Sequence, residues 1–285
     1  MKTALFTVAY PQAKEYFPDF FASVAAQNDR AFDLLIVNDG VAPYLLASGP
    51  NVKVASPQGS AVALRKFGIK WMQDEGYEAA VFADIDDRFD ADRVAVSRRL
   101  LMQRDLVVNE LVPFGQSIVE PKALLSPRLS EGQSIGEEQL RRSNCMGLSN
   151  TAARVSGLGD LANAIPDDVI AFDWALFART VIAGANAIFT GSTRTGYRQH
   201  GANIAGIYVN SEEQIIRGVG VKADHYAQLA DCSEWYTTQA EAYEQLRAQL
   251  NADADRRRAY CARVRSQQPL QPFWWESIRL EEEFA

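Results

Sequence analysis

The sequence predicts an α/β fold with a mostly parallel sheet flanked by helices, followed by a helical C-terminal extension. The apolar runs in the first half of the chain are continuous rather than alternating, which is typical of strands covered on both faces. Segments with helical apolar spacing separate these runs. Beyond about residue 207 such runs disappear, and residues 211–265 are rich in Glu, Gln, Ala and Arg, which indicates two or three helices. We therefore expect a domain over 1–206 and the helical extension over 207–285.

The composition favours a soluble globular protein. Hydrophobic residues make up 47% of the 285 residues, which is enough for one large domain or a domain with an appendage. The formal net charge of −7 argues against a general nucleic-acid binder, which usually carries a basic stripe. There is no stretch of 18 apolar residues, so we expect no transmembrane segment. The start of the chain predicts a first strand rather than a signal peptide.

The three cysteines do not suggest a structural site. Cys145, Cys232 and Cys261 are widely spaced and form no CxxC pair. Neither a disulfide framework nor a zinc site is therefore expected, and a reducing compartment is the default. We expect a cytoplasmic protein.

The elements are expected in an alternating order. The expected strands are 4–9, 34–37, 52–55, 79–83, 105–109, 118–119 and 187–190. The expected helices are 17–27, 61–75, a helix from 90 or 92 to 102, and 170–183. A polar loop is expected over 126–133, and a glycine-containing loop over 197–203.

Three carboxylates end the strand at 79–83, and they carry the first functional prediction. Asp84 and Asp86 are two residues apart, so in a strand they point the same way, while Ile85 faces the core. Two oxygen ligands with room for water and phosphate suit Mg²⁺ or Mn²⁺ carrying a diphosphate. The alternative interpretation is a strand that enters a turn, where Asp is common.

Further polar groups follow other predicted strands. Asp39 and the turn at 57–60 also lie at strand carboxyl ends, where parallel α/β sheets bind their ligands. We therefore expect them to share one crevice with Asp84 and Asp86. The sequence contains neither GxGxxG nor a Walker A loop, which argues against a dinucleotide-binding fold or a P-loop enzyme.

The motifs resemble, in their order, those of family 2 glycosyltransferases of the GT-A Rossmann-like fold, over roughly residues 3–206. The matching pieces are Thr7-Val8-Ala9-Tyr10, Ser23-Val24-Ala25-Ala26-Gln27, Ile36-Val37-Asn38-Asp39-Gly40, Gly59-Ser60-Ala61-Val62-Ala63-Leu64-Arg65, Ala83-Asp84-Ile85-Asp86-Asp87, Phe172-Asp173-Trp174 and Tyr197-Arg198-Gln199-His200-Gly201-Ala202-Asn203. Each piece is weak alone, but their shared order with Asp-x-Asp at a strand end is specific. Two positions depart from the family pattern: Asn38 replaces the first Asp of its Asp-Asp-Gly turn, and Lys66 stands where Asn usually follows the Arg.

The resemblance implies a set of site residues. On the donor side it implies Thr7 and Ala9 of the first strand, Asp39 at the nucleobase, Arg65 near the base or diphosphate, and Asp84 at the ribose or sugar. It implies Asp86 as a ligand of Mn²⁺ or Mg²⁺, and His200 close to the metal or diphosphate. It implies Asp173 as the catalytic base, with Asp87 and Arg198 as further candidates.

Each of these residues also has a structural interpretation. Asp173 could simply cap a helix start, and Asp167 and Asp168 are equally acidic candidates for cap or base. Arg65 could belong to a solvated helix face. A lone His is more often structural than a ligand. His200, however, lies between Arg198 and Asn203 in a glycine-containing loop, which favours a position beside the phosphate or the metal. Trp174 could stack on a sugar, but its helical spacing favours the core, and His225 is expected to be structural.

The resemblance implies an inverting transfer of a sugar from a nucleoside-diphosphate donor to the hydroxyl of a glycan, lipid-linked or other acceptor, in surface polysaccharide or other glycoconjugate synthesis. The alternative is a catalytically inactive GT-A module that binds a nucleotide-sugar or a partner. A haloacid-dehalogenase phosphatase is disfavoured because the motif follows three other strands and Gly159-Asp160 has no second Asp four residues on. An EF-hand loop is excluded because Arg88 occupies a ligand position.

The C-terminal segment carries an aromatic cluster. Phe273, Trp274 and Trp275 precede three glutamates at 281–283. The cluster could dock on the domain, contact a second subunit or enter a membrane interface, and the acidic run disfavours anionic lipid, so we expect docking. A homo-oligomer through the C-terminal helices and a peripheral membrane location stay open at this point.

Overall fold

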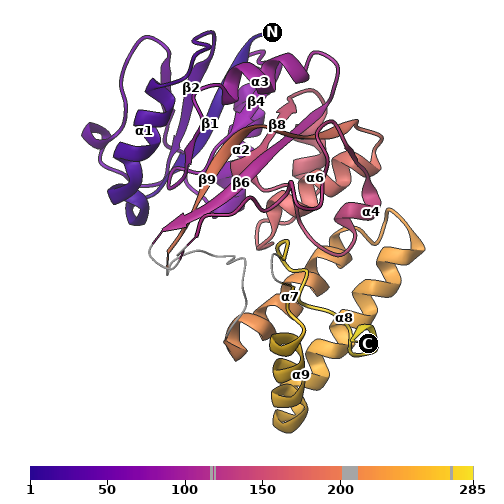
Figure 1. Cartoon of the computed structure of the whole chain (residues 1–285). Helices are drawn as coiled ribbons and strands as arrows, with labels where there is room; N and C mark the ends of the chain where they lie inside the picture. Colours follow the sequence, from indigo (N-terminus) through magenta and orange to yellow (C-terminus); the bar gives the residue numbers. More distant parts are fainter. Residues whose placement is uncertain (116–117, 119, 201–210, 270–271, 285) are drawn as a thin grey trace.

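The computed structural model describes residues 1–115, 118, 120–200, 211–269 and 272–284. Figure 1 shows an α/β part with a group of helices beyond one of its ends, and the N-terminus lies at the opposite end. The strand β1 starts at that far end, so the carboxyl ends of the strands parallel to it face the helical group.

One half of the sheet is parallel, as the sequence predicts. Its order is β3-β2-β1-β4, with all neighbours parallel. The bounds are β1 Thr3–Ala9, β2 Asp33–Asn38, β3 Val52–Ala55 and β4 Ala79–Phe82. The residues of β4 are buried throughout, because helices cover both faces of the sheet.

The other half of the sheet is mixed. The order continues β4-β8-β6-β9-β5, and β7 pairs with β9. Here β6 and β9 run in the direction of β1, whereas β5, β7 and β8 run against it. The bounds are β5 Arg88–Phe89, β6 Leu106–Gly115, β7 Ser134–Ile135, β8 Thr151–Arg154 and β9 Ala187–Gln199.

The helices of the α/β part bury apolar residues against both faces of the sheet. Phe6 and Phe82 belong to one core with residues of α2 and α6, and Leu5 and Val81 to the other with residues of α1 and α3. The bounds are α1 Phe17–Ala25, α2 Ala61–Asp74, α3 Arg93–Leu100, α4 Glu137–Leu140, α5 Leu158–Asn163 and α6 Phe172–Ile182. Short 3₁₀ helices are η1 Pro11–Tyr16, η2 Pro43–Leu45, η3 Leu148–Asn150 and η4 Glu281–Glu283.

The C-terminal part contains three helices, in agreement with the prediction: α7 Glu212–Gln228, α8 Glu234–Ala252 and α9 Ala254–Ser266. The aromatic cluster docks on the domain, as expected. The backbone N–H of Asn144 donates to the carbonyl of Trp274 at 3.0 Å, and Phe273 and Trp274 are buried. The predicted division into 1–206 and 207–285 remains a proposal, because its boundary falls outside the described residues.

Three sequence predictions need correction. Tyr197, Arg198 and Gln199 lie in β9 and not in a loop, because they pair with the extended end of β6; the rest of the expected loop, 201–203, falls outside the described residues. The strand expected at 105–109 continues to Gly115. In the strand expected at 118–119, Ile118 is not in a strand, and Val119 lies outside the described residues.

The missed elements have a common cause. β8 has the short sequence Thr-Ala-Ala-Arg, without the branched or aromatic residues that mark strands, and the last residues of β9 are polar. Within the described part of the chain, no helix is long and apolar enough to span a membrane.

Candidate active site

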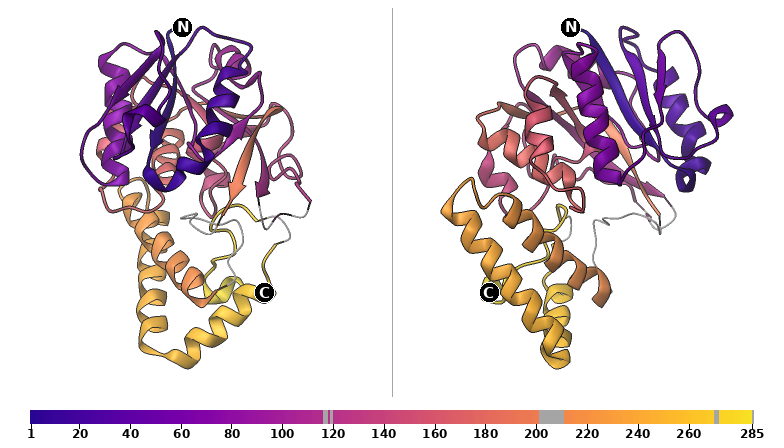
Figure 2. Two further views of the ribbon diagram at one scale, coloured as in Figure 1. Left: turned by 90° about the vertical axis from the view of Figure 1, so that its left-hand side faces the viewer. Right: turned by 180° about the vertical axis from the view of Figure 1, so that it is seen from behind.

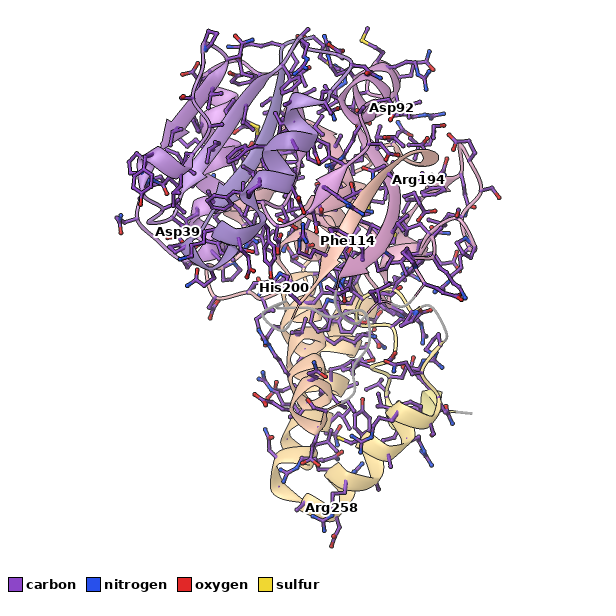
Figure 3. The ribbon with its side chains drawn as sticks, turned by 60° about the vertical axis from the view of Figure 1, so that its left-hand side comes forward. Asp39, Asp92, Phe114, Arg194, His200 and Arg258 are labelled. Carbon is purple, nitrogen blue, oxygen red and sulfur yellow. The ribbon has the colours of Figure 1, made fainter. Side chains whose placement is uncertain are left out.

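A pocket of about 340 Å³ opens at the carboxyl ends of β1, β2 and β4. Five of the sequence-predicted residues line it: Asp39, Arg65, Asp84, Asp86 and Asp173. Figure 3 shows Asp39 and His200 at the end of the α/β part that faces the C-terminal helices, whereas Asp92 and Arg194 lie away from that end. The pocket lies where the parallel sheet predicts a crevice, and it collects carboxylates from three separate segments, but none of residues 57–60 lines it.

Asp86 lies at the centre of a small polar cluster. Its side chain is only 12% exposed. Tyr10 donates its hydroxyl to Asp86 Oδ2 at 3.1 Å, and His200 Nε2 lies 3.0 Å from the same oxygen. The ring of Tyr16 packs against that of His200, with 5.0 Å between centroids. His200 is thus brought to Asp86, as the resemblance implies, and Tyr10 is a third member that we did not predict.

Asp87 is not among the residues that line the pocket, and its side chain holds the turn over 84–87 in place. It is almost fully buried, accepts the hydroxyl of Ser149, and accepts the backbone N–H of Arg198 at 2.6 Å. Arg198 also donates Nε to the carbonyl of Asp86 at 2.6 Å and Nη2 to Asp19 at 2.6 Å. The backbone after β4 is therefore held to β9 and, through Arg198, to α1.

The two departures from the family pattern have local explanations. Asn38 is buried and closes its own turn: its Nδ2 donates to the carbonyl of Val41, and its Oδ1 accepts the N–H of Val41. Lys66 is not among the residues that line the pocket, and its Nζ forms an ion pair with Asp167 at 2.6 Å. Asp39 is exposed at the end of β2, and Arg65 of α2 lines the pocket. Burial raises the pKa of Asp84 and of Asp173, and the positive charge of Arg65 offsets part of that rise in both.

Thr7 and Ala9 do not reach the pocket. Both are buried in β1, where they pair with Ile36 and Asn38. The pocket is lined instead by Val8 and Tyr10, which alternate with them along the strand. The carbonyl of Ala9 accepts the N–H of Asp39 at 2.8 Å, so Ala9 positions the backbone of that residue.

Asp173 is the candidate base that lies in the pocket. It sits in the first turn of α6, and its Oδ1 accepts the N–H of Trp174 at 2.8 Å. Asp167 and Asp168 are exposed and are not among the residues that line the pocket. Trp174 is fully buried and stacks on His225 at 3.6 Å between centroids, so both belong to the core, in line with the expectation for each.

Three carboxyls in or beside the pocket, those of Asp84, Asp173 and Asp87, lie in an environment that favours their neutral forms. Burial raises the pKa of Asp84, and the charge of Asp86 raises it further. Burial likewise raises the pKa of Asp173. For Asp87, burial and then the charges of Asp86 and Asp84 raise the pKa well above its usual range. A cation brought to this cluster would relieve the repulsion between these carboxylates.

Several residues of the site were not predicted from the sequence. Ser149 comes from the region of weak signal at 116–159, and so do Asn144 and Gly147, which line the pocket. Trp274 and Trp275 come from the far C-terminal segment and also line it. Only the aromatic run at 273–275 offered a signal, because clustered tryptophans near a terminus indicate a contact surface.

The fit of a divalent metal can be judged from Asp86 and His200. They present a carboxylate oxygen and an imidazole nitrogen, which suit an ion that also binds diphosphate oxygens and water. Among the described residues there is no group of three or more His, Cys, Asp or Glu placed to hold a metal. The donor set therefore fits an ion delivered with a diphosphate, and not a protein cage.

Comparison with known proteins identifies the fold. No protein-family model matches the chain, and no curated protein does. Among solved structures, Staphylococcus aureus TarS 1-349 in complex with UDP-GlcNAc matches with a TM-score of 0.57 at 14% identity, covering 80% of this chain and 66% of that one. The complex with UDP has a TM-score of 0.56 and 65% of that chain covered. In a further TarS structure this chain spans 40% of the length. TarS is a GT-A glycosyltransferase, so the likeness shows the GT-A fold.

Proposed function

We propose that the chain is an inverting glycosyltransferase that moves a sugar from a nucleoside-diphosphate donor to an acceptor hydroxyl. The observation that carries this proposal is the pocket itself, which collects Asp39, Arg65, Asp84, Asp86 and Asp173 at the carboxyl ends of the strands of a GT-A fold. The complexes of TarS with UDP and UDP-GlcNAc make UDP the first nucleotide to test. A surface polysaccharide or another glycoconjugate is the proposed product.

The residues divide the work as follows. Asp39 binds the base, and Asp84 the ribose or sugar, while Arg65 contacts the diphosphate. The acceptor oxygen attacks the anomeric carbon as the bond from that carbon to the diphosphate oxygen breaks. Asp173 takes the hydroxyl proton, and the nucleoside diphosphate leaves. Because burial raises the pKa of Asp173, this carboxylate is a stronger base than one in water.

Asp86 and His200 are the residues that would hold Mn²⁺ or Mg²⁺. When bound, the ion supplies positive charge that stabilises the departing diphosphate. The hydroxyl of Tyr10 donates to the Asp86 carboxylate, and Arg198 Nε donates to the Asp86 carbonyl, so side chain and backbone are both held before any ligand arrives. This preorganisation lowers the reorganisation needed on binding.

The test is a thermal-shift and calorimetric screen of UDP, GDP and dTDP, each with and without Mn²⁺, on the wild type and on Asp86→Ala. Asp90→Ala is the matched control, because Asp90 is exposed and outside the pocket lining. We expect one nucleotide to stabilise the wild type and Asp90→Ala, with a metal-dependent part that Asp86→Ala loses.

The other outcomes separate the alternatives. Nucleotide binding that is indifferent to both metal and Asp86→Ala would remove Asp86 as a ligand and leave a metal-independent transferase. Binding of the intact nucleotide-sugar without turnover on any acceptor would favour the inactive module. The absence of any nucleotide binding would overturn the transferase proposal.

A further inference from the structure

The C-terminal segment enters the pocket as a tight turn. Over 273–278, the N–H of Glu276 donates to the carbonyl of Phe273, and the N–H of Ile278 to that of Trp275, both at 3.1 Å. Trp274 and Trp275 line the pocket together with Asp173. Both views of Figure 2 show the last part of the chain between the helical group and the α/β part.

This turn, here called the tryptophan turn (273–278), is anchored to both parts of the molecule. On the α/β side, Arg128 forms a two-bond ion pair with Glu276, at 2.7 and 2.8 Å. On the helical side, Tyr243 of α8 donates its hydroxyl to the carbonyl of Ile278 at 3.2 Å. Anchors on both sides make the turn a fixed wall of the pocket.

Trp275 has a strained backbone. Its φ is +67°, and among the described residues it is the only non-glycine with a positive φ. A bulky L residue is disfavoured there because its Cβ crowds the backbone, and glycine would avoid this cost. Strain kept at a residue that lines a pocket points to a role for the side chain in that pocket. We therefore expect the half-buried ring of Trp275 to have a role in this pocket.

The position of the turn along the sheet edge separates it from the donor residues. Asp39 follows β2 and Asp84 follows β4, on the parallel side. Trp274 instead meets Tyr197 of β9 edge to face, with 5.3 Å between ring centroids. A Cβ built on Gly147 would lie 3.6 Å from Asp173 Oδ2 and 3.6 Å from Trp274 Cη2. Trp274 thus lies beside the proposed base, on the side of the pocket away from Asp39, and Trp275 lines the same pocket.

We propose that Trp274 and Trp275 form the acceptor-binding surface and that the acceptor group bound there is a sugar ring. This inference rests on the proposed function. A pyranose has a face of C–H groups that packs on an aromatic ring, while its hydroxyls stay at the rim for polar partners. Trp275 contacts that face, and Trp274, held against Tyr197, supports it. One acceptor hydroxyl then reaches Asp173.

The test uses the full chain, with and without UDP, and a panel of 4-nitrophenyl pyranosides (glucoside, galactoside, mannoside, N-acetylglucosaminide). Affinities are measured by calorimetry and saturation-transfer NMR for the wild type, Trp275→Ala and Trp275→Gly. Trp275→Gly removes the ring and also relieves the strain of the positive φ. A loss of glycoside binding in this variant would therefore not be explained by a folding defect. Trp71→Ala is the control, since Trp71 of α2 is outside the pocket lining.

We expect at least one glycoside to bind the wild type and Trp71→Ala, with about five- to tenfold weaker binding to both Trp275 variants. UDP stabilisation should be equal in all four proteins. Unchanged glycoside affinity in the Trp275 variants, or no glycoside binding to the wild type, overturns this inference. If the wild type still binds UDP, the proposed function stands in either case. If the wild type binds none of UDP, GDP and dTDP, the proposed function itself is overturned.

Discussion

Gly218 of α7 lies directly against Ile278 of the tryptophan turn: a Cβ built on Gly218 would come within 2.8 Å of Ile278 Cγ1. Ile278 is fully buried, so its side chain has little room to move. Trp275 also lies close to Gly218, with its Cε3 at 3.8 Å from that Cβ. The absence of a side chain at residue 218 is thus what lets the turn approach the helix.

Gly218→Ala and Gly220→Ala form a matched pair within α7. In an exposed helix interior, Gly→Ala stabilises by about 1 kcal/mol. A Cβ at Gly220 meets only Arg247, at an ordinary 3.9 Å, so Gly220→Ala should raise the melting temperature. Gly218→Ala should lower it and weaken glycoside binding, because the new methyl group displaces the tryptophan turn. Thermal unfolding measures the melting temperatures of both variants. Equal stabilisation by the two substitutions would contradict the close approach of Ile278 to Gly218.

Arg198→Met should weaken nucleotide binding without touching the carboxylates. The guanidinium bonds to the carbonyl of Asp86, and losing a charge-assisted bond of this kind costs about 1.5–3 kcal/mol. Its pair with Asp19 adds little, because the Asp19 side chain is half exposed. Arg194→Met, on the same strand but exposed, is the control. Calorimetry should show weaker UDP binding for Arg198→Met only; equal affinities would show that the turn keeps its shape without Arg198.

The parallel half of the sheet could be predicted from sequence because continuous apolar runs and strand-end turns are local signals. The positions of Asp39, Asp84 and Asp86 at strand ends followed from the same local patterns, whereas Arg65 followed only from the family resemblance. All four line the pocket. The role of Asp87 could not be predicted, since its burial depends on Ser149 and on the last residues of β9, which are far away in sequence.

The other wall of the pocket has no comparable local signal. Asn144 and Gly147 are placed by β8, which has no strand signature, and by a backbone bridge to Trp274. That bridge joins residues 130 positions apart. A single sequence contains the aromatic run but not its partner, so docking could be predicted and the docking surface could not.

Lys222 makes stability depend on pH. It is buried in α7, 3.4 Å from the hydroxyl of Tyr243, and burial lowers its pKa from 10.5 to about 7. Between these values the unfolded chain binds more protons than the folded one, so stability rises with pH from about 7 to 10.5. The other titratable or charged groups that act on Lys222 are His225, Glu283, Arg142, Arg279 and Glu276.

Lys222→Met should remove this dependence. The variant should be more stable than the wild type by at least about 1 kcal/mol at pH 7, because the wild type must release a proton or bury a charge. The gain should shrink as pH approaches 10.5, where both states of the wild type lose the proton. Urea unfolding at pH 7, 8.5 and 10 measures the difference in unfolding free energy between the variant and the wild type. A difference that does not change with pH would assign the gain in stability to packing alone.

Asp173→Asn should abolish transfer while leaving the nucleotide bound. Losing a general base typically costs about 10²–10⁴-fold in rate. The amide keeps the size of the side chain and its acceptor for the N–H of Trp174. Asp168→Asn is the control, because Asp168 is exposed and not among the residues that line the pocket. Release of nucleoside diphosphate with a glycoside acceptor, together with calorimetry of UDP, separates the rate from binding.

The pH dependence of the transfer rate is a second test of the Asp173 carboxyl. Only the ionised form of Asp173 accepts the acceptor proton, and burial raises its pKa above the usual range. The rate with wild type should therefore rise with pH through that raised pKa, as one proton is lost. In Asp173→Asn the residual rate should no longer follow that ionisation. A residual rate that keeps the wild-type profile would move the base role to another group of the pocket, and a full rate in Asp173→Asn would remove Asp173 from the reaction.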